Sequence, residues 1–178
     1  KGWKKHKKHK KHKKYKKHKK HKKFKAKVPA VTLEEAREDV KNLGKYLFKV
    51  SVKKDFDTLK KIVLTAEECK DFAKPEFFQK YVNEKKMKEK YEKWQGLFKG
   101  TKFIKVKAKD EDKKTFKPGD KDPKFQELID NITKEVVVWQ AKVMGKNRMK
   151  ETAKCSFVAI KLKDKDWRLI RLKGCKVQ

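Results

Sequence analysis

All five histidines of this 178-residue chain lie close to its N-terminus, in a repeat that places a ring at every third position. Imidazoles bind metal ions or transfer protons. Flanking lysines repel cations, however, and residues 1–27 contain no carboxylate or thiolate side chain that could complete a metal site. We therefore expect no metal site here. Two lysines fill nearly every gap of the repeat, whose rings are Trp3, His6, His9, His12, Tyr15, His18, His21 and Phe24.

The chemistry that this segment favours is contact with a polyanion. Residues 1–27 hold 17 lysines and no aspartate or glutamate. Lysines neutralise phosphates and release counterions, and flat rings stack on unpaired bases, which contributes about 1–3 kcal/mol per base. The pattern predicts an RNA-binding extension whose contacts come from Trp3, Lys4, Lys5, His6, Lys7, Lys8, His9, Lys10, Lys11, His12, Lys13, Lys14, Tyr15, Lys16, Lys17, His18, Lys19, Lys20, His21, Lys22, Lys23, Phe24, Lys25 and Lys27.

The spacing of the rings also constrains the backbone. Each residue of an α-helix turns the chain by about 100°, so rings three residues apart would drift around the axis instead of forming one stripe. In polyproline II, which has three residues per turn, they would line one edge. Repulsion between the lysines opposes a free helix, so we expect this extension to be disordered until a polyanion binds it. A helix enclosed by RNA on all sides is the alternative bound form.

The rest of the chain is basic in its own right. Residues 28–178 hold 39 basic and 24 acidic side chains, within a formal net charge of +32 for the whole sequence. Such an imbalance opposes compaction unless a polyanion offsets it, and the candidates are nucleic acid, an anionic membrane surface and an acidic polysaccharide. No segment approaches the ~20 apolar residues of a membrane span. We divide the chain into a basic extension, 1–27, and a single α+β domain, 28–178.

Local signals predict helices in the first half of the domain. Two capping boxes, Thr32–Glu35 and Thr65–Glu68, each indicate a helix start. Pro75 suits the first position of a helix, and apolar residues after it keep a helical period. The expected helices begin near 33, occupy 57–64, begin near 66 and occupy 75–95.

The second half favours strands, with one ambiguous segment. Residues 101–109 predict a strand with a lysine-rich face, and 110–123 predict a charged loop. Residues 123–144 keep a helical period and predict a helix that ends at Gly145, although the valines at 136–138 favour a strand from 135 as the alternative. The end of the chain predicts a hairpin with strands at about 155–163 and 167–173. The fold class is therefore α+β, a small and mostly helical body with a C-terminal β-hairpin.

Five residues of the domain are further candidates for phosphate contact. Lysine outnumbers arginine 52 to 4 in the sequence. Bidentate recognition of phosphates and bases favours arginine, so we expect point-charge contacts and little readout of base sequence. The candidates lie on the strand at 101–109 and in the hairpin, and they are Lys102, Lys105, Lys107, Arg168 and Arg171.

No motif in the domain indicates catalysis. Residues 22–178 contain no histidine, which removes Ser-His and Cys-His chemistry, and the glycines form neither a phosphate-binding loop nor a dinucleotide motif. The carboxylates of 110–112 are flanked by lysines, and we interpret them as a solvated loop. We therefore expect that the chain is not an enzyme, and that it uses no cofactor and no small-molecule substrate.

The cysteines and the first residue suggest a compartment. Cys69, Cys155 and Cys175 are odd in number and form no CxxC pair, which predicts reduced thiols and a reducing compartment. Lys1 is not an initiator methionine, which is consistent with removal of an organelle-targeting presequence. Together these features favour mitochondria.

The overall pattern resembles ribosomal proteins, in which small folded bodies carry long basic extensions into ribosomal RNA. The resemblance implies a structural constituent of a ribosome whose partners are ribosomal RNA and neighbouring ribosomal proteins. It further implies the ribosome of the mitochondrial matrix, with a cytosolic ribosome or the nucleus as alternatives. Two other functions fit the same charge: a DNA- or chromatin-binding nuclear protein, and a peripheral binder of anionic membranes or polysaccharides.

Overall fold

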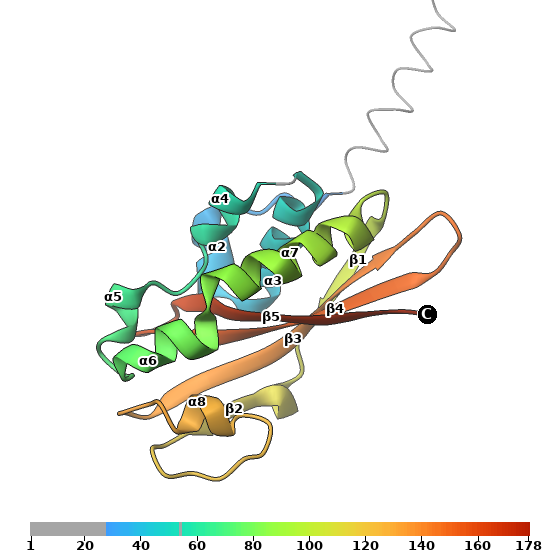
Figure 1. Cartoon of the computed structure of the whole chain (residues 1–178). Coiled ribbons are helices and arrows are strands. Elements are labelled where there is room, and N and C mark those ends of the chain that lie inside the picture. The colour runs from blue at the N-terminus through green and yellow to red at the C-terminus, as the bar shows by residue number, and fades with distance from the viewer. Residues whose placement is uncertain (1–27, 54) are drawn as a thin grey trace, which may run out of the picture.

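The computed structural model describes residues 28–53 and 55–178, so the predictions made for 1–27 lie outside the described residues. A helical N-terminal half packs against a C-terminal antiparallel sheet (Figure 1). The expected α+β class is thereby confirmed. The helical elements of the first half are α2 (Leu33–Glu38), α3 (Val40–Lys53), α4 (Phe56–Lys60), α5 (Ala66–Cys69), α6 (Pro75–Phe77), the π-helical turn η1 (Phe78–Val82) and α7 (Glu84–Phe98).

The sheet is built around one central strand. Its strands are β1 (Lys102–Lys107), β2 (Lys113–Phe116), β3 (Val136–Lys146), β4 (Thr152–Lys161) and β5 (Trp167–Val177). The order is β1-β3-β4-β5, and all pairings between these strands are antiparallel. β1 and β2 pair with opposite ends of β3, because β1 lies beside residues 142–146 and β2 beside residues 136–139.

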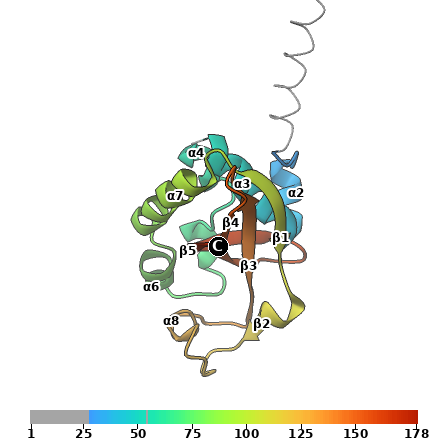
Figure 2. The ribbon, with the colours of Figure 1, turned by 90° about the vertical axis from the view of Figure 1, so that its right-hand side faces the viewer.

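Helices cover the two faces of the sheet unequally. Figures 1 and 2 both show α2, α3, α4 and α7 on one side, whereas the short helix α8 (Gln126–Ile129) lies on the other side, near β2. The hydrophobic core therefore lies mainly between the helical layer and the sheet, where Trp94, Phe48 and Phe157 are fully buried. The same face of the sheet at the β1 end carries Val106, which packs against α3.

Both predicted capping boxes are present. The side chain of Thr32 accepts a hydrogen bond from the backbone N–H of Glu35, and the Glu35 carboxylate accepts one from the N–H of Thr32. Thr65 and Glu68 make the same reciprocal pair. A cap uses only residues within one turn, which is why it could be predicted without knowledge of the tertiary structure.

The predicted long helix over 75–95 is wrong in one respect. It starts at Pro75 but is interrupted at Asn83, whose φ is 40°. A π-helical turn precedes this residue, and the Asn83 side chain then caps α7 by accepting from the N–H of Lys86 at 3.1 Å. Asparagine tolerates a positive φ better than most residues, so it serves here both as a break and as a new helix start.

The predicted helix ending at Gly145 is also wrong, and the alternative strand from 135 is confirmed by β3. Strand partners on both sides of β3 outweigh its helical period. The charged loop predicted for 110–123 contains the short strand β2 as well as the 3-10 turn η2 (Asp110–Asp112). The expected strand at 101–109 and the hairpin of β4 and β5 are confirmed.

The prediction of reduced cysteines is contradicted for two of the three residues. Cys155 and Cys175 face each other across β4 and β5 and form a disulfide, while Cys69 is a buried free thiol. The absence of a CxxC pair gave no indication of this bond, because pairing across strands depends on register and not on sequence spacing. Among the described residues, none of the helices has the length and apolar content that crossing a bilayer requires.

Candidate nucleic-acid interface

β1 carries its lysines on one side of the sheet. Val106 is buried against the helical layer, whereas Lys105 and Lys107 on either side of it are exposed. A register shift in this strand makes Ile104 an extra residue, so Lys102 shares the side of Lys105. The three lysines predicted on this strand therefore point in one direction, away from the helical layer.

The register of the neighbouring strands brings further lysines to the same side. Residues that are partners across antiparallel strands share a face of the sheet. Their pairings form three rows across the strands, and we call the seven lysines in them the lysine face. The rows are Lys107–Lys142–Ser156, Lys105–Met144–Lys154–Lys176 and Lys102–Lys146–Thr152.

The lysine face is broad and uniformly positive. Neighbouring strands are about 4.8 Å apart and alternate residues of a strand about 6.7 Å apart. The longest row therefore spans roughly 14 Å across four strands, the other two rows span roughly 10 Å, and the three rows together extend roughly 13 Å along the strands. None of the rows contains an aspartate or a glutamate. Six of the seven lysines are exposed and Lys154 is partly buried, with its ammonium 3.4 Å from the side-chain oxygen of Gln178.

Crowding of positive charge is evident at Lys107. The pKa of this lysine is lowered from its ordinary value, first by the positive charge of Lys109, then by partial desolvation, and also by Lys105 and Lys154. Like charges opposite each other in a sheet are destabilising, and no carboxylate offsets them within the rows. A polyanion laid across the lysine face would remove this repulsion.

The helical layer fixes the backbone beneath the lysine face. A Cβ added to Gly44 of α3 would lie 2.6 Å from a methyl carbon of Val106 in β1. A Cβ added to Gly145 of β3 would lie 3.2 Å from the rings of Phe48 and Phe98. Helix and sheet therefore approach closely at both places, and the strands that carry the lysines pack directly against the helical layer.

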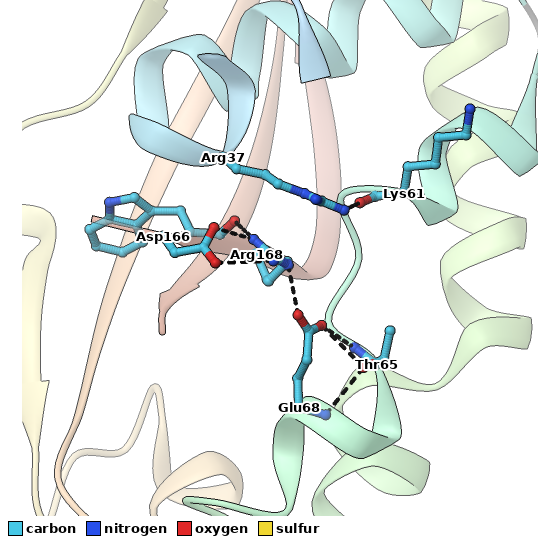
Figure 3. Close-up of polar contacts among 7 residues, drawn as sticks. Arg37, Lys61, Thr65, Glu68, Asp166 and Arg168 are labelled. Carbon is cyan, nitrogen blue, oxygen red and sulfur yellow. Dashed lines mark hydrogen bonds and ion pairs between the residues drawn. The ribbon is translucent and has the colours of Figure 1, made fainter. Parts of the chain in front are cut away.

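Arg168, in contrast, is an internal structural residue. Its side chain is 9% exposed, and Nε donates to the Glu68 carboxylate at 3.0 Å (Figure 3). The same guanidinium is bonded to the Asp166 carboxylate and to the carbonyl of Trp167. Glu68 also belongs to the capping box of α5, so the arginine joins this helix to the β4–β5 turn. With its donors engaged by carboxylates, we leave Arg168 out of the proposed contact set.

Arg171 is intermediate between the exposed lysines of the lysine face and the buried, paired Arg168. The centre of its guanidinium is 3.9 Å from the centroid of the Tyr81 ring, and an N–H group is 3.7 Å from the Glu127 carboxylate. Its side chain is 31% exposed. It does not belong to the lysine face, because β5 places it toward η1 and the α8 region.

Sequence reasoning missed the lysines that β3, β4 and β5 contribute. A helix that ends at Gly145 leaves Lys146 outside it and has no strand partners for Lys142, whereas the strand β3 places both lysines on one side of the sheet, with Met144 between them and with β1 and β4 beside them. Alternation of lysines with buried residues was the available signal for Lys142, Lys146 and Lys154. Lys176 lacks this signal, because Cys175 is only partly buried and Val177 is exposed. The structure thus joins Lys102, Lys105 and Lys107 to four lysines that were not predicted.

Comparison with known proteins adds no assignment. No family model matches the sequence, and neither curated proteins nor solved structures give a significant match. The lysine face and the composition of residues 1–27 are therefore the features from which we infer a function.

Proposed function

We propose that this chain is an RNA-binding structural component of a ribonucleoprotein, with a ribosome as the first candidate for that particle. The observation that carries the proposal is the lysine face, a surface of seven lysines, six of them exposed, without a carboxylate among its rows. The extension at 1–27, with 17 lysines and no acidic residue, supplies the same chemistry at higher density.

The mode of contact follows from the residue types. Lysine ammonium groups act as point charges on phosphates, whereas bidentate readout of bases favours arginine. The rows contain no arginine and no aromatic ring, so the lysine face serves to neutralise and position a phosphate backbone. Within this proposal, the rings at every third place of the extension contribute stacking on unpaired bases.

The compartment is left open by the proposal. Reduced cysteines were one of the two features that favoured mitochondria. This feature is lost for Cys155 and Cys175, because they are bonded to each other. Structural disulfides are typical of oxidising environments, although they also occur elsewhere. The proposal therefore extends to ribonucleoproteins of any compartment, with ribosomal RNA and neighbouring ribosomal proteins as the proposed partners.

The first test measures how RNA binding depends on salt. We compare the full chain with the variant Lys105→Gln/Lys107→Gln/Lys142→Gln, using single-stranded RNA. Each lost phosphate contact lowers the slope of log K against log salt concentration by about 0.7, so we expect a loss of about 2 in the slope. The control Lys41→Gln/Lys85→Gln/Lys93→Gln removes the same charge from exposed helical positions, and it should leave most of the slope intact. Equal slopes in the two variants would contradict a specific role for the lysine face.

The second test asks which particle contains the protein. Native extracts are sedimented through a sucrose gradient with and without RNase. Co-sedimentation with one ribosomal subunit that is lost on RNase treatment supports the ribosomal proposal. Sedimentation near the top of the gradient in both samples contradicts it, and flotation with anionic vesicles after nuclease treatment would then favour the membrane alternative.

A further inference from the structure

A second concentration of positive charge lines a cavity on the other edge of the sheet. The cavity has a volume of about 390 Å³ and lies between the start of α7, the η1 turn and β5. We call it the cationic cavity. The charged residues that line it are Lys86 and Lys90 of α7, and Arg171 and Lys173 of β5, with Tyr81 and Met87 among its other lining residues.

The cationic cavity is lined by four positively charged side chains. None of its lining residues is acidic, and the nearest carboxylate with a described contact is that of Glu127, 3.7 Å from the Arg171 guanidinium. The cavity beside Arg168 offers a contrast, because Glu68, Asp71, Glu135 and Asp166 line it together with lysines and balance their charge. With four cationic side chains and one neighbouring carboxylate, the cationic cavity carries uncompensated positive charge.

Two of the four cations are held in place. The guanidinium of Arg171 rests 3.9 Å above the Tyr81 ring, and Tyr81 is itself buried. Lys173 is partly buried, and its pKa is lowered by burial first and then by the positive charges of Lys124 and Arg171. Its ammonium has Gln140 at 3.5 Å and the Phe125 ring at 5.7 Å as described neighbours, and neither is an anion. The Arg171 guanidinium is thus positioned before a ligand arrives, which reduces the ordering that binding requires.

The helix adds to the same potential. Lys86 and Lys90 are one turn apart near the start of α7, so their side chains lie on one side of it. The cavity therefore receives positive charge from the side chains of two elements.

We propose that the cationic cavity binds a phosphate group, carried either by a small free ligand or by an RNA chain. A phosphate is compact and multiply charged, and it accepts several hydrogen bonds at once, which suits convergent lysine and arginine side chains. The binding site is separate from the lysine face, since the two share no residue. It therefore does not depend on the proposed function, and each can fail without the other.

The structure provides a local reporter for the test. The indole Nε1–H of Trp94 donates to the backbone carbonyl of Lys173 at 3.0 Å. The Trp94 indole resonance and the amide resonance of Gly174, which also lines the cavity, report on this wall in nuclear magnetic resonance spectra of the full chain.

The experiment titrates the full chain with inorganic phosphate at constant ionic strength, balanced with chloride. We expect saturable shifts of both resonances below about 10 mM, which is the range of weak specific binding. The variant Lys86→Gln/Lys90→Gln should weaken the apparent affinity about tenfold, because it removes two charged donors. The control Lys85→Gln/Lys93→Gln takes the same charge from exposed positions of the same helix and should change it by less than about twofold.

A parallel titration with short single-stranded RNA distinguishes the two sources of phosphate. Shifts of the same resonances by RNA, lost in Lys86→Gln/Lys90→Gln, assign the site to phosphates of an RNA chain. Shifts by inorganic phosphate but not by RNA assign it to a small free ligand. The absence of saturable shifts in both titrations, or equal weakening in the two variants, would overturn the proposal.

Discussion

The two ends of the β4–β5 hairpin differ in whether acidic residues compensate their positive charge. At the open end, Lys154 and Lys176 are partners across the strands, and no acidic residue lies in their row. At the turn end, Arg168 is bonded to Glu68 and Asp166 and is almost fully buried. At the open end, no acidic residue in the row compensates the positive charge of the lysines. At the turn end, two carboxylates compensate the positive charge of Arg168.

The covalent link of the hairpin lies at the unbalanced end. Cys155 directly follows Lys154 in β4, and Cys175 directly precedes Lys176 in β5. The disulfide therefore lies on the buried side of the same two strands. The turn end has no such bond and is held by the arginine and its carboxylates. The disulfide thus holds the two strands together where Lys154 and Lys176 face each other.

The largest effect should come from removing the disulfide. Cys155→Ala/Cys175→Ala opens a link with a sequence separation of 20 residues, and we expect a loss of about 3 kcal/mol in the free energy of unfolding. Urea denaturation with and without reductant measures it. The variant should lose more at low salt than at high salt, because screening weakens the repulsion between lysines. A reductant without effect on the wild-type transition would contradict the structural importance of the bond.

Breaking the balanced end should have the next largest effect. Arg168→Met leaves Glu68 and Asp166 without their partner. Full burial would make this loss about 3–5 kcal/mol, but these carboxylates are 27% and 42% exposed, so we expect about 2 kcal/mol. Denaturation in urea gives the value, and Lys142→Met at the lysine face is the matched control, with little expected change. Equal effects of the two substitutions would remove the distinction between the ends.

A single reversal of charge should convert the open end to the balanced type. Lys154→Glu places a carboxylate opposite Lys176, and opposite charges across strands contribute about 0.2–1 kcal/mol. We therefore expect a small gain in the free energy of unfolding together with weaker RNA binding. Lys154→Gln separates the loss of charge from the new pair. Loss of stability in Lys154→Glu would show that the repulsion inferred for this row is not the controlling term.

The smallest effect concerns Lys107, whose pKa is lowered in the folded protein. A lysine with a depressed pKa disfavours folding while it is charged. That penalty is fully present below the folded pKa, and it is relieved as the pH rises through the folded pKa toward the ordinary value of 10.5. Lys107→Gln should accordingly raise the urea midpoint slightly near neutral pH and at low salt, and the difference should shrink above pH 10.5. A lowered midpoint would contradict the crowding of charge.

Signals confined to one turn of the chain predicted the structure best. The capping boxes at Thr32 and Thr65, the helix start at Pro75 and the strand at 101–109 could all be inferred from neighbouring residues. The β3 strand could not, because its helical period competes with partners that lie far away in the sequence. The break at Asn83 depends on a single positive φ, and many asparagines do not adopt one.

The candidate sites divide in the same way. Three of the seven lysines of the lysine face were predicted, because the alternation in β1 is visible locally. The other four required the register of β3, β4 and β5. Arg168 was selected for its charge alone, and its carboxylate partner Glu68 is separated from it by 100 positions in the sequence. Composition therefore indicated the kind of chemistry, and topology decided which side chains are available for it.

The contact between Gly44 and Val106 has a consequence for how this sequence can vary. The Cβ of any larger residue at 44 would meet the valine methyl groups at 2.6–2.7 Å, which would displace β1 and its lysines from the rows. Relatives with this fold should therefore keep glycine at the position equivalent to 44. The positions of the individual lysines should vary more freely, because a diffuse positive field depends on the total charge of the rows more than on the place of each charge. The lysine face therefore depends most strictly on a residue outside it, the uncharged Gly44 of α3 on the opposite side of the sheet.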